Sequence, residues 1–194
     1  THTGVIQTNG LYPPFKVKWS VNLNATVGYP LIAGGKIFVL AGDYNSKAVN
    51  LYALSTGTGK TIWGPVLVPE STDGFWAAAA YDNGVVFVVP GTTPEISWGA
   101  VYAYNAKTGK LIWNAKLYGQ SFFSSAPTAM NGMVYTGGAA DGGTVYAVRE
   151  KDGIVAWTTG VENGDNSSPV VTGDGVYVSY VCPQTYRFNT LNGT

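Results

Sequence analysis

The chain of 194 residues is long enough to bury a sizeable core, and its length favours a single domain. Eleven basic residues balance eleven acidic ones without a Lys/Arg cluster, which argues against a nucleic-acid partner. The longest apolar runs, such as residues 84–89, are far shorter than the roughly 20 residues of a membrane-spanning helix. Low charge beside 26 glycines and 13 tyrosines is typical of an all-β protein rich in turns.

Residues 1–18 form a lead-in segment before the first repeat. Its last part, "PPFKVKW", ends at Trp19 and is predicted to contribute an outer strand. Each of the four later segments combines a short apolar run, a tight turn and an alternating apolar run. These segments are "GYPLIAGGKIFVL", "WAAAAYDNGVVFVV", "SAPTAMNGMVYTG" and "SSPVVTGDGVYVS". The turn pairs Gly-Gly, Asn-Gly, Asn-Gly and Asp-Gly favour positive φ, so we predict four β-hairpins.

A second pattern follows the first three hairpins. The segments "LYALSTGTGKTIW", "VYAYNAKTGKLIW" and "VYAVREKDGIVAW" each read as a strand, a polar turn and a strand that ends at tryptophan. Within each, alanine lies ten residues and glycine four residues before the tryptophan. Trp19, Trp63, Trp113 and Trp157 recur every 44 to 50 residues. The sequence therefore predicts units of four antiparallel strands, a repeat typical of β-propeller blades.

These repeats resemble the PQQ-like, or quinoprotein-like, propeller family with its tryptophan-docking motif Ala-x-Asp-x-x-x-Gly-x-x-x-Trp. The matching positions are Ala53, Ser55, Gly59 and Trp63; Ala103, Asn105, Gly109 and Trp113; and Ala147, Gly153 and Trp157, with Arg149 departing at the third position. We expect alanine to leave room for an indole, glycine to adopt the left-handed turn conformation, and the indole to pack as a wedge between blades. A β-sandwich does not explain why these residues recur in register, and a solenoid normally has a shorter period.

The predicted fold class is all-β, with about three and a half to four blades of a ring of seven or eight. Gly193 occupies the turn-glycine position, so residues 1–194 are predicted to form a single partial propeller domain whose last blade is interrupted. The preferred interpretation is the N-terminal half of a longer propeller. The alternative is that two copies assemble into one ring. Cys182 is the only cysteine, and it can pair with a cysteine in a missing half.

The strand order places two sets of loops on one face, where propeller ligands commonly gather. Carboxylates there suit Ca²⁺ or sugar hydroxyls, and aromatic rings suit sugar rings or an apolar partner. The competing interpretation is that the acids are merely solvated and the aromatics belong to the core. Candidate ligand residues on this face are Glu70, Asp73, Trp76, Trp98, Phe122, Glu162 and Asp165.

Three sequons make Asn24, Asn166 and Asn192 potential glycosylation sites in a secretory setting. Family dehydrogenases hold pyrroloquinoline quinone (PQQ) and Ca²⁺ and often a vicinal disulfide. This sequence has no adjacent cysteines and no acid that we can match to those positions. We therefore expect no catalytic residues, no metal and no cofactor.

The favoured function is that of a non-catalytic extracytoplasmic scaffold for protein or surface components. The alternatives are half of a PQQ- and Ca²⁺-dependent dehydrogenase and a sugar-binding surface protein. The expected partners are the rest of the propeller and a protein or glycan at the loops. Neither nucleic acid nor a membrane span is expected.

Overall fold

The computed structural model describes residues 12–43, 48–71, 77–91, 98–120, 123, 125–138, 143–162, 167–180 and 184–194. These residues form antiparallel strands grouped into four sheets, which we call blades 1 to 4. Blade 1 contains β1 (Thr26–Val27), β2 (Leu31–Ala33), β3 (Lys36–Asp43), β4 (Ala48–Ser55) and β5 (Thr61–Val68). Blade 2 contains β6 (Ala78–Asp82), β7 (Val85–Val89), β8 (Trp98–Asn105) and β9 (Leu111–Tyr118). Blade 3 contains β10 (Thr128–Met130), β11 (Met133–Gly138), β12 (Thr144–Arg149) and β13 (Val155–Gly160), and blade 4 contains β14 (Val170–Val171), β15 (Val176–Tyr180) and β16 (Gln184–Phe188).

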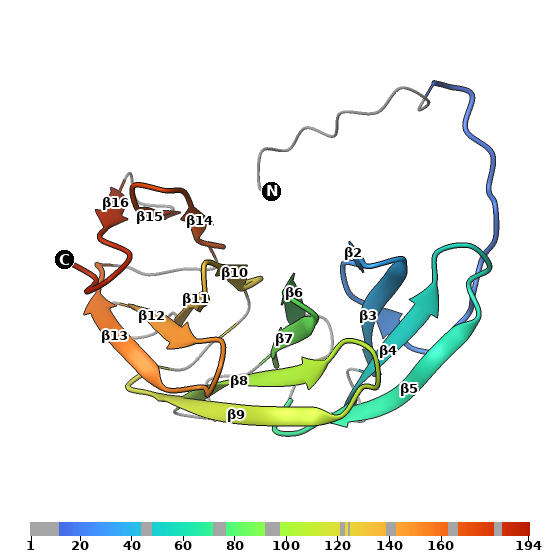
Figure 1. Cartoon of the computed structure of the whole chain (residues 1–194), viewed down its shortest axis with the longest axis horizontal. Helices are drawn as coiled ribbons and strands as arrows, with labels where there is room; N and C mark the ends of the chain where they lie inside the picture. Colours follow the sequence, from blue (N-terminus) through green and yellow to red (C-terminus); the bar gives the residue numbers. More distant parts are fainter. Residues whose placement is uncertain are drawn as a thin grey trace.

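The blades follow one another around an arc in chain order (Figure 1). The short strands β2, β6, β10 and β14 line its concave side, and β5, β9 and β13 lie on its convex side. In blades 2 and 3 the spatial order of the strands equals their sequence order. The predicted β-propeller of four-stranded antiparallel blades is confirmed. No helix among the described residues is long and apolar enough to cross a membrane.

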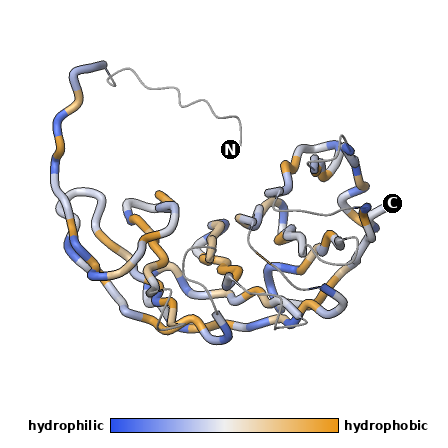
Figure 2. The backbone as a smooth tube through the Cα atoms, turned by 180° about the vertical axis from the view of Figure 1, so that it is seen from behind, coloured by the Kyte–Doolittle hydropathy of each residue, from blue (hydrophilic) through white to orange (hydrophobic). Residues whose placement is uncertain are grey.

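Burial of apolar strand residues joins each blade to the next. One core lies between blades 1 and 2, a second between blades 2 and 3, and a third between blades 3 and 4. Figure 2 shows hydrophobic residues concentrated within the strands and hydrophilic ones concentrated at the turns. Val86, Phe87 and Val88 of β7 are fully buried, because a central strand of a blade is covered on both faces. The blades are therefore held together mainly by hydrophobic packing.

The first three hairpins form with the predicted turn chemistry. Their central pairs, Gly34-Gly35, Asn83-Gly84 and Asn131-Gly132, all have positive φ, as two-residue turns between twisted strands require. The fourth hairpin differs, because neither Asp174 nor Gly175 has positive φ. Thr172 N–H instead donates to the carbonyl of Gly175 at 3.0 Å and closes a longer loop. The prediction of a positive-φ Asp-Gly turn was therefore wrong.

Two further predictions about strands need correction. Each tryptophan is the third residue of its outer strand rather than its end, because the turn closes just before Thr61, Leu111 and Val155. The outer strand continues with alternating exposed and buried residues, and its polar positions hid it in the sequence. The predicted outer strand at residues 13–19 is absent, since no strand is assigned to residues 12–25 and no described sheet lies beside them to pair with.

Candidate functional site

A repeated contact between blades dominates the face that carries the hairpin turns, which we call the turn face. The indole Nε1 of Trp63 in β5 donates to the carbonyl of Ala106, in the turn between β8 and β9 of blade 2, at 3.1 Å. The same contact occurs at the other two described seams, between Trp113 and Glu150 at 2.8 Å and between Trp157 and Thr190 at 3.0 Å. Trp19 of the lead-in segment makes it with Thr56 of blade 1 at 3.1 Å.

The turn glycine is required by its conformation and by the indole above it. Gly109 has a φ of 72° and lies directly under Trp63. A Cβ built on Gly109 would lie 2.7 Å from Cε3 of Trp63, closer than real Cβ atoms approach other atoms. Gly59, Gly153 and Gly193 face Trp19, Trp113 and Trp157 in the same way. The turn glycine of one blade and the tryptophan that precedes that blade in the arc therefore form a single contact. This explains why glycine and tryptophan recur at a fixed spacing along the chain.

The remaining motif positions shape the turn itself. Asn105 Oδ1 accepts hydrogen bonds from the N–H groups of Lys107 and Thr108, both at 3.0 Å. Ala103 is fully buried and pairs across the strands with Trp113 of its own blade. In blade 3 Arg149 replaces asparagine, and its guanidinium bonds the Asp152 carboxylate. Asp152 also accepts a hydrogen bond from Ile154 N–H, as Thr108 does from Lys110 N–H in blade 2.

The structure brings two predicted ligand residues, Glu70 and Trp98, into one cluster near the opposite face, which carries the loops. Glu70 follows β5 of blade 1 and reaches β8 and β9 of blade 2. Its Oε2 accepts a hydrogen bond of 2.6 Å from the hydroxyl of Tyr102, and its Oε1 lies 3.8 Å from Lys116 Nζ. Lys116 Nζ also lies 3.9 Å from the centroid of the Trp98 ring. The cluster therefore fastens blade 1 to blade 2.

Glu70 is held by two polar contacts, a hydrogen bond from Tyr102 and an ion pair with Lys116. Burial, followed by the hydrogen bond to Glu70 and its charge, raises the pKa of Tyr102 well above the usual tyrosine value. Tyr102 therefore stays protonated and remains a donor to Glu70. Lys116 covers one face of the Trp98 indole by a cation–π contact, which leaves less of the ring open to a sugar. Ligand binding by Glu70 and Trp98 stays a prediction.

The other predicted ligand residues are not assembled with this cluster. Glu162 is exposed beyond β13, and its backbone N–H donates to the hydroxyl of Tyr186 at 3.1 Å. Asp73, Trp76, Phe122 and Asp165 lie outside the described residues. Within the described ranges, no group of three or more His, Cys, Asp or Glu side chains is placed to hold a metal ion.

Two of the three sequon asparagines lie among the described residues. Asn24 and Asn192 are exposed, and the amide oxygen of Asn192 accepts a hydrogen bond of 2.9 Å from the Thr194 hydroxyl of the same sequon. Asn166 lies outside the described residues. Glycosylation of all three remains a prediction.

Sequence reasoning missed a carboxyl pair on the turn face, at the seam between blades 2 and 3. Glu150 in blade 3 is hydrogen-bonded to Asp82, at the end of β6 in blade 2. Burial, and then the charge and hydrogen bond of Asp82, raise the pKa of Glu150 to about 7, while the Gly132 N–H acts in the opposite direction. The buried Oε1 of Glu150 has no hydrogen-bond partner among the described residues. A shallow hollow of about 330 Å³ adjoins the pair and is lined by Val85, Gly132, Met133, Arg149, Glu150 and Lys151.

A weak signal for this pair was present in the sequence. The turn position that receives the indole holds Thr56, Ala106 and Thr190 in the other blades, and only blade 3 has an acid there. That substitution could have drawn attention to Glu150. Its partner Asp82 could not have been named without the structure, because the two residues belong to different blades.

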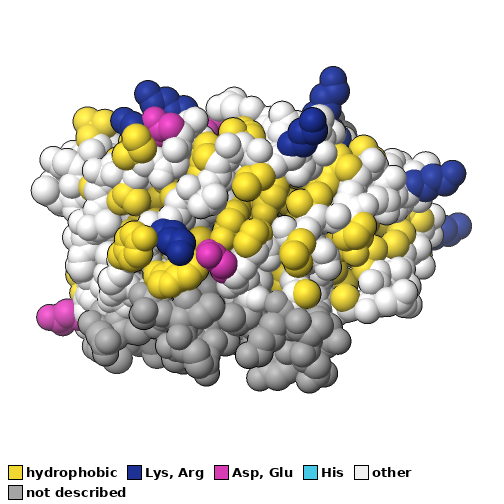
Figure 3. All heavy atoms as spheres, turned by 90° about the horizontal axis from the view of Figure 1, so that it is seen from below, with side chains coloured by type: hydrophobic (Ala, Val, Ile, Leu, Met, Phe, Trp, Pro, Cys, Tyr) yellow, Lys and Arg dark blue, Asp and Glu magenta, His cyan; other side chains and the backbone are white. Residues whose placement is uncertain are grey.

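The convex rim exposes large apolar side chains. Ile62 and Leu67 of β5 and Leu111 and Ile112 of β9 are each about half exposed or more. Tyr118, at the end of β9, and Ile154, just before β13, extend the series. Figure 3 views this side of the molecule and shows hydrophobic patches running across it. We call these six residues the apolar rim.

Comparisons with known proteins agree with this architecture. The PQQ repeat family model described as outer membrane protein assembly factor BamB matches residues 47–193. Tetrathionate hydrolase of Acidithiobacillus ferrooxidans is 26% identical over 181 residues, which cover 80% of this chain and 34% of the hydrolase. BamB of Escherichia coli is 38% identical over 79 residues, which cover 38% of this chain and 20% of BamB. The chain thus spans 34% of one relative's length and 20% of the other's.

Solved structures show the same fold at low sequence identity. BamB from Moraxella catarrhalis aligns with a TM-score of 0.64 and 22% identity, covering 89% of this chain and 49% of that one. The computationally designed Ika4 protein aligns with a TM-score of 0.62 and 13% identity, covering 87% of this chain and 93% of that one. Since the family model spans most of the sequence and the blades carry its repeat, the chain belongs to the PQQ-like repeat family.

Proposed function

We propose that this chain belongs to a non-catalytic, extracytoplasmic β-propeller that binds protein partners as an assembly scaffold. The similarity to BamB, which is named as an outer membrane protein assembly factor, supports both the role and the location. The proposed scaffold needs neither PQQ nor Ca²⁺. The Trp-to-turn contacts at each seam suit such a role, because they fix neighbouring blades relative to one another.

The observation that carries this proposal is the apolar rim. Leu111 and Ile112 are 48% and 50% exposed, and Leu67 is 61% exposed on the neighbouring outer strand. Because about half or more of each side chain is exposed to solvent, these residues contribute little to the packing between blades. Apolar surface that continues across neighbouring elements is typical of a site for protein–protein contact. The rim therefore offers a place where a partner could bind without disturbing the blades.

Photo-crosslinking tests the proposal in the full-length protein in its native cells. A photoreactive residue at Leu111 should form adducts with outer membrane assembly proteins. The same residue at Asn114, an exposed polar position on β9, should give few such adducts. Ile112→Asp should weaken the adducts at position 111 without lowering the melting temperature. Identical adducts from positions 111 and 114 would contradict a partner site at the rim.

A catalytic role is the second candidate, because one relative that matches most of the chain is an enzyme, tetrathionate hydrolase. The specific form expected from the resemblance is half of a PQQ- and Ca²⁺-dependent dehydrogenase. Addition of PQQ with Ca²⁺ to the full-length protein separates the two roles. A change in the absorption spectrum and a higher melting temperature would favour the enzyme, whereas no change in either would favour the scaffold.

A further inference from the structure

The turn face brings together turn residues that lie far apart in the sequence. Each blade presents two turns there, the hairpin turn and the turn that follows the third strand of the blade. In blades 1 to 3 backbone hydrogen bonds of 2.9 to 3.4 Å join the two turns, as between Ala106 N–H and the carbonyl of Gly84. The exposed side chains of these turns therefore share one surface, although they come from different repeats.

Two positions around the turn glycine carry lysine or a large apolar side chain in most blades. Two residues before the glycine lie Lys107, Lys151 and Leu191, in blades 2, 3 and 4. Directly after the glycine lie Lys60, Lys110 and Ile154, in blades 1, 2 and 3. Gly57 and Thr194 complete the set, so no acid occurs at either position. We call the four exposed lysines Lys60, Lys107, Lys110 and Lys151 the turn lysines.

The turn lysines form no ion pair within the described part of the chain. The cations of the ion pairs found there are Lys116, Arg149 and Arg187. Figure 3 shows Lys and Arg side chains projecting from the upper edge of the convex side. Several unpaired ammonium groups on one face create a positive potential, which attracts an anionic partner even though the net charge of the chain is zero.

The acidic side chains on the same face are held by neighbours within it. Asp152 lies next to Lys151 but is bonded to the guanidinium of Arg149 at 2.7 Å. Glu150 is hydrogen-bonded to Asp82, and burial together with that carboxylate raises the pKa of Glu150 to about 7. The pair therefore retains a proton below about pH 7, which removes one negative charge from the face.

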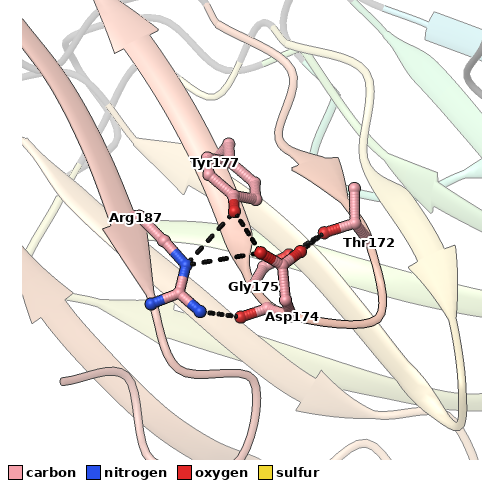
Figure 4. Close-up of polar contacts among 5 residues, drawn as sticks. All are labelled: Thr172, Asp174, Gly175, Tyr177 and Arg187. Carbon is pink, nitrogen blue, oxygen red and sulfur yellow. Dashed lines mark hydrogen bonds and ion pairs between the residues drawn. The ribbon is translucent and has the colours of Figure 1, made fainter.

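Asp174, in the hairpin turn of blade 4, is also compensated locally (Figure 4). Its carboxylate accepts hydrogen bonds from the hydroxyl of Tyr177 at 2.7 Å and from the hydroxyl of Thr172. Arg187 Nε lies 3.8 Å from the same carboxylate, and the guanidinium also donates to the Asp174 carbonyl. The negative charge of Asp174 is thus offset within blade 4, and the charge left without a partner on the turn face is positive.

The apolar side chains among the turn lysines indicate which kind of anionic partner fits. Leu191 is 81% exposed and Ile154 is 54% exposed, at positions that hold lysine in other blades. An acidic protein surface would pair with the lysines but offer these two side chains no apolar environment. A membrane surface offers both, because lipid phosphates attract lysine while the boundary with the acyl chains accepts apolar side chains. Since all the turns end at one face, they can approach a flat surface together.

We propose that the turn face docks on a membrane surface that carries anionic phospholipids. The turn lysines lie at the phosphate groups, and Leu191 enters the boundary between the headgroups and the acyl chains. The contact is peripheral and needs no membrane-spanning segment. It goes beyond the proposed scaffold function and does not depend on it, because the β5 and β9 part of the apolar rim stays open to a protein partner.

Vesicle sedimentation with the full-length protein tests the role of charge. Vesicles of phosphatidylglycerol and phosphatidylethanolamine should bind the protein more tightly than vesicles of phosphatidylcholine. Lys107→Gln with Lys110→Gln should weaken binding to the anionic vesicles by about 25-fold, the loss typical of two lysines at such a surface. Lys107→Arg with Lys110→Arg is the matched control, since it retains both charges and should bind as the native protein does. Equal binding to both kinds of vesicle, or native affinity in the glutamine variant, would overturn the proposal.

A polarity-sensitive dye tests the orientation on the membrane and separates a lipid surface from an acidic protein. In a Cys182→Ser background, a dye on Leu191→Cys should shift its emission to the blue when anionic vesicles are added. A dye on Glu162→Cys, exposed near the opposite face, should not shift. Soluble polyglutamate should leave the emission at position 191 unchanged, because it offers no apolar phase. Tighter binding to polyglutamate than to anionic vesicles, or equal shifts at positions 191 and 162, would contradict docking through the turn face.

Discussion

The indole Nε1 of Trp113 donates a hydrogen bond of 2.8 Å to the backbone carbonyl of Glu150, which lies in the next blade. Its six-membered ring covers Gly153 of the same turn, where a Cβ would approach Cε3 to 2.7 Å. Phe87 packs beside the indole at a centroid distance of 5.8 Å. One side chain thus links two blades through a polar contact, a glycine and a neighbouring ring.

Removal of this side chain should destabilise the protein strongly. Trp113→Ala is expected to lower the free energy of unfolding by roughly 3 to 5 kcal/mol, the range for truncation of a large core aromatic. Trp113→Phe keeps a ring but loses the donor, so it should cost less. Urea titrations of the three proteins measure the difference. A melting temperature unchanged by Trp113→Ala would disprove the docking role.

Two substitutions separate the conformational reason for glycine in the turn from the steric reason. Gly84→Ala introduces a Cβ at positive φ in open space, and the left-handed conformation should cost about 1 to 2 kcal/mol. Gly109→Ala adds the collision with Trp63 and should cost clearly more. Thermal unfolding of both variants compares the two costs. Equal losses would show that the indole yields without penalty and that glycine is needed only for its φ.

The carboxyl pair at the seam between blades 2 and 3 predicts a dependence of stability on pH. The pKa of Glu150 is raised from 4.5 to about 7 by burial and by Asp82, so the folded protein binds this proton more tightly than the unfolded chain. The resulting stabilisation is complete below about pH 4.5 and is lost as the pH rises to about 7. Glu150→Gln should therefore gain stability relative to the native protein across that interval.

Urea midpoints of both proteins across that pH interval provide the measurement. Glu162→Gln is a suitable control, because it removes an exposed carboxyl group that is not part of the pair. A constant difference between the native protein and Glu150→Gln at all pH values would contradict the assignment.

The cluster around Glu70 predicts energetic coupling between blades 1 and 2. Glu70→Ala and Tyr102→Phe each remove one partner of the 2.6 Å hydrogen bond. The double variant should lose less stability than the sum of the single variants, with a coupling of about 1 kcal/mol, because each single change leaves the other group without its partner. Purely additive losses would show that the contact contributes nothing to the seam.

Much of the fold could be predicted because its signals are local. The pairs Asn83-Gly84 and Asn131-Gly132 specify tight turns by their own conformational preferences, and the spacing of Ala103, Gly109 and Trp113 repeats wherever a blade repeats. The end of each outer strand was misjudged, since residues such as Asn114 and Lys116 are polar on the exposed face of a strand. The Asp174 turn was misjudged because side-chain hydrogen bonds hold it.

The sequence by itself determined the blade repeat, its turns and the residues that form the docking motif. Only the tertiary structure showed that Trp63 lies on Gly109 rather than on the turn of its own blade, that Glu150 meets Asp82, and that Lys116 covers Trp98. The physical reason is that a strand or turn follows from neighbouring residues, whereas contacts across a seam join residues that become neighbours only when two blades pack together. Trp19 shows the difference most clearly, since its indole bonds the turn of blade 1 although no strand is assigned to its own segment.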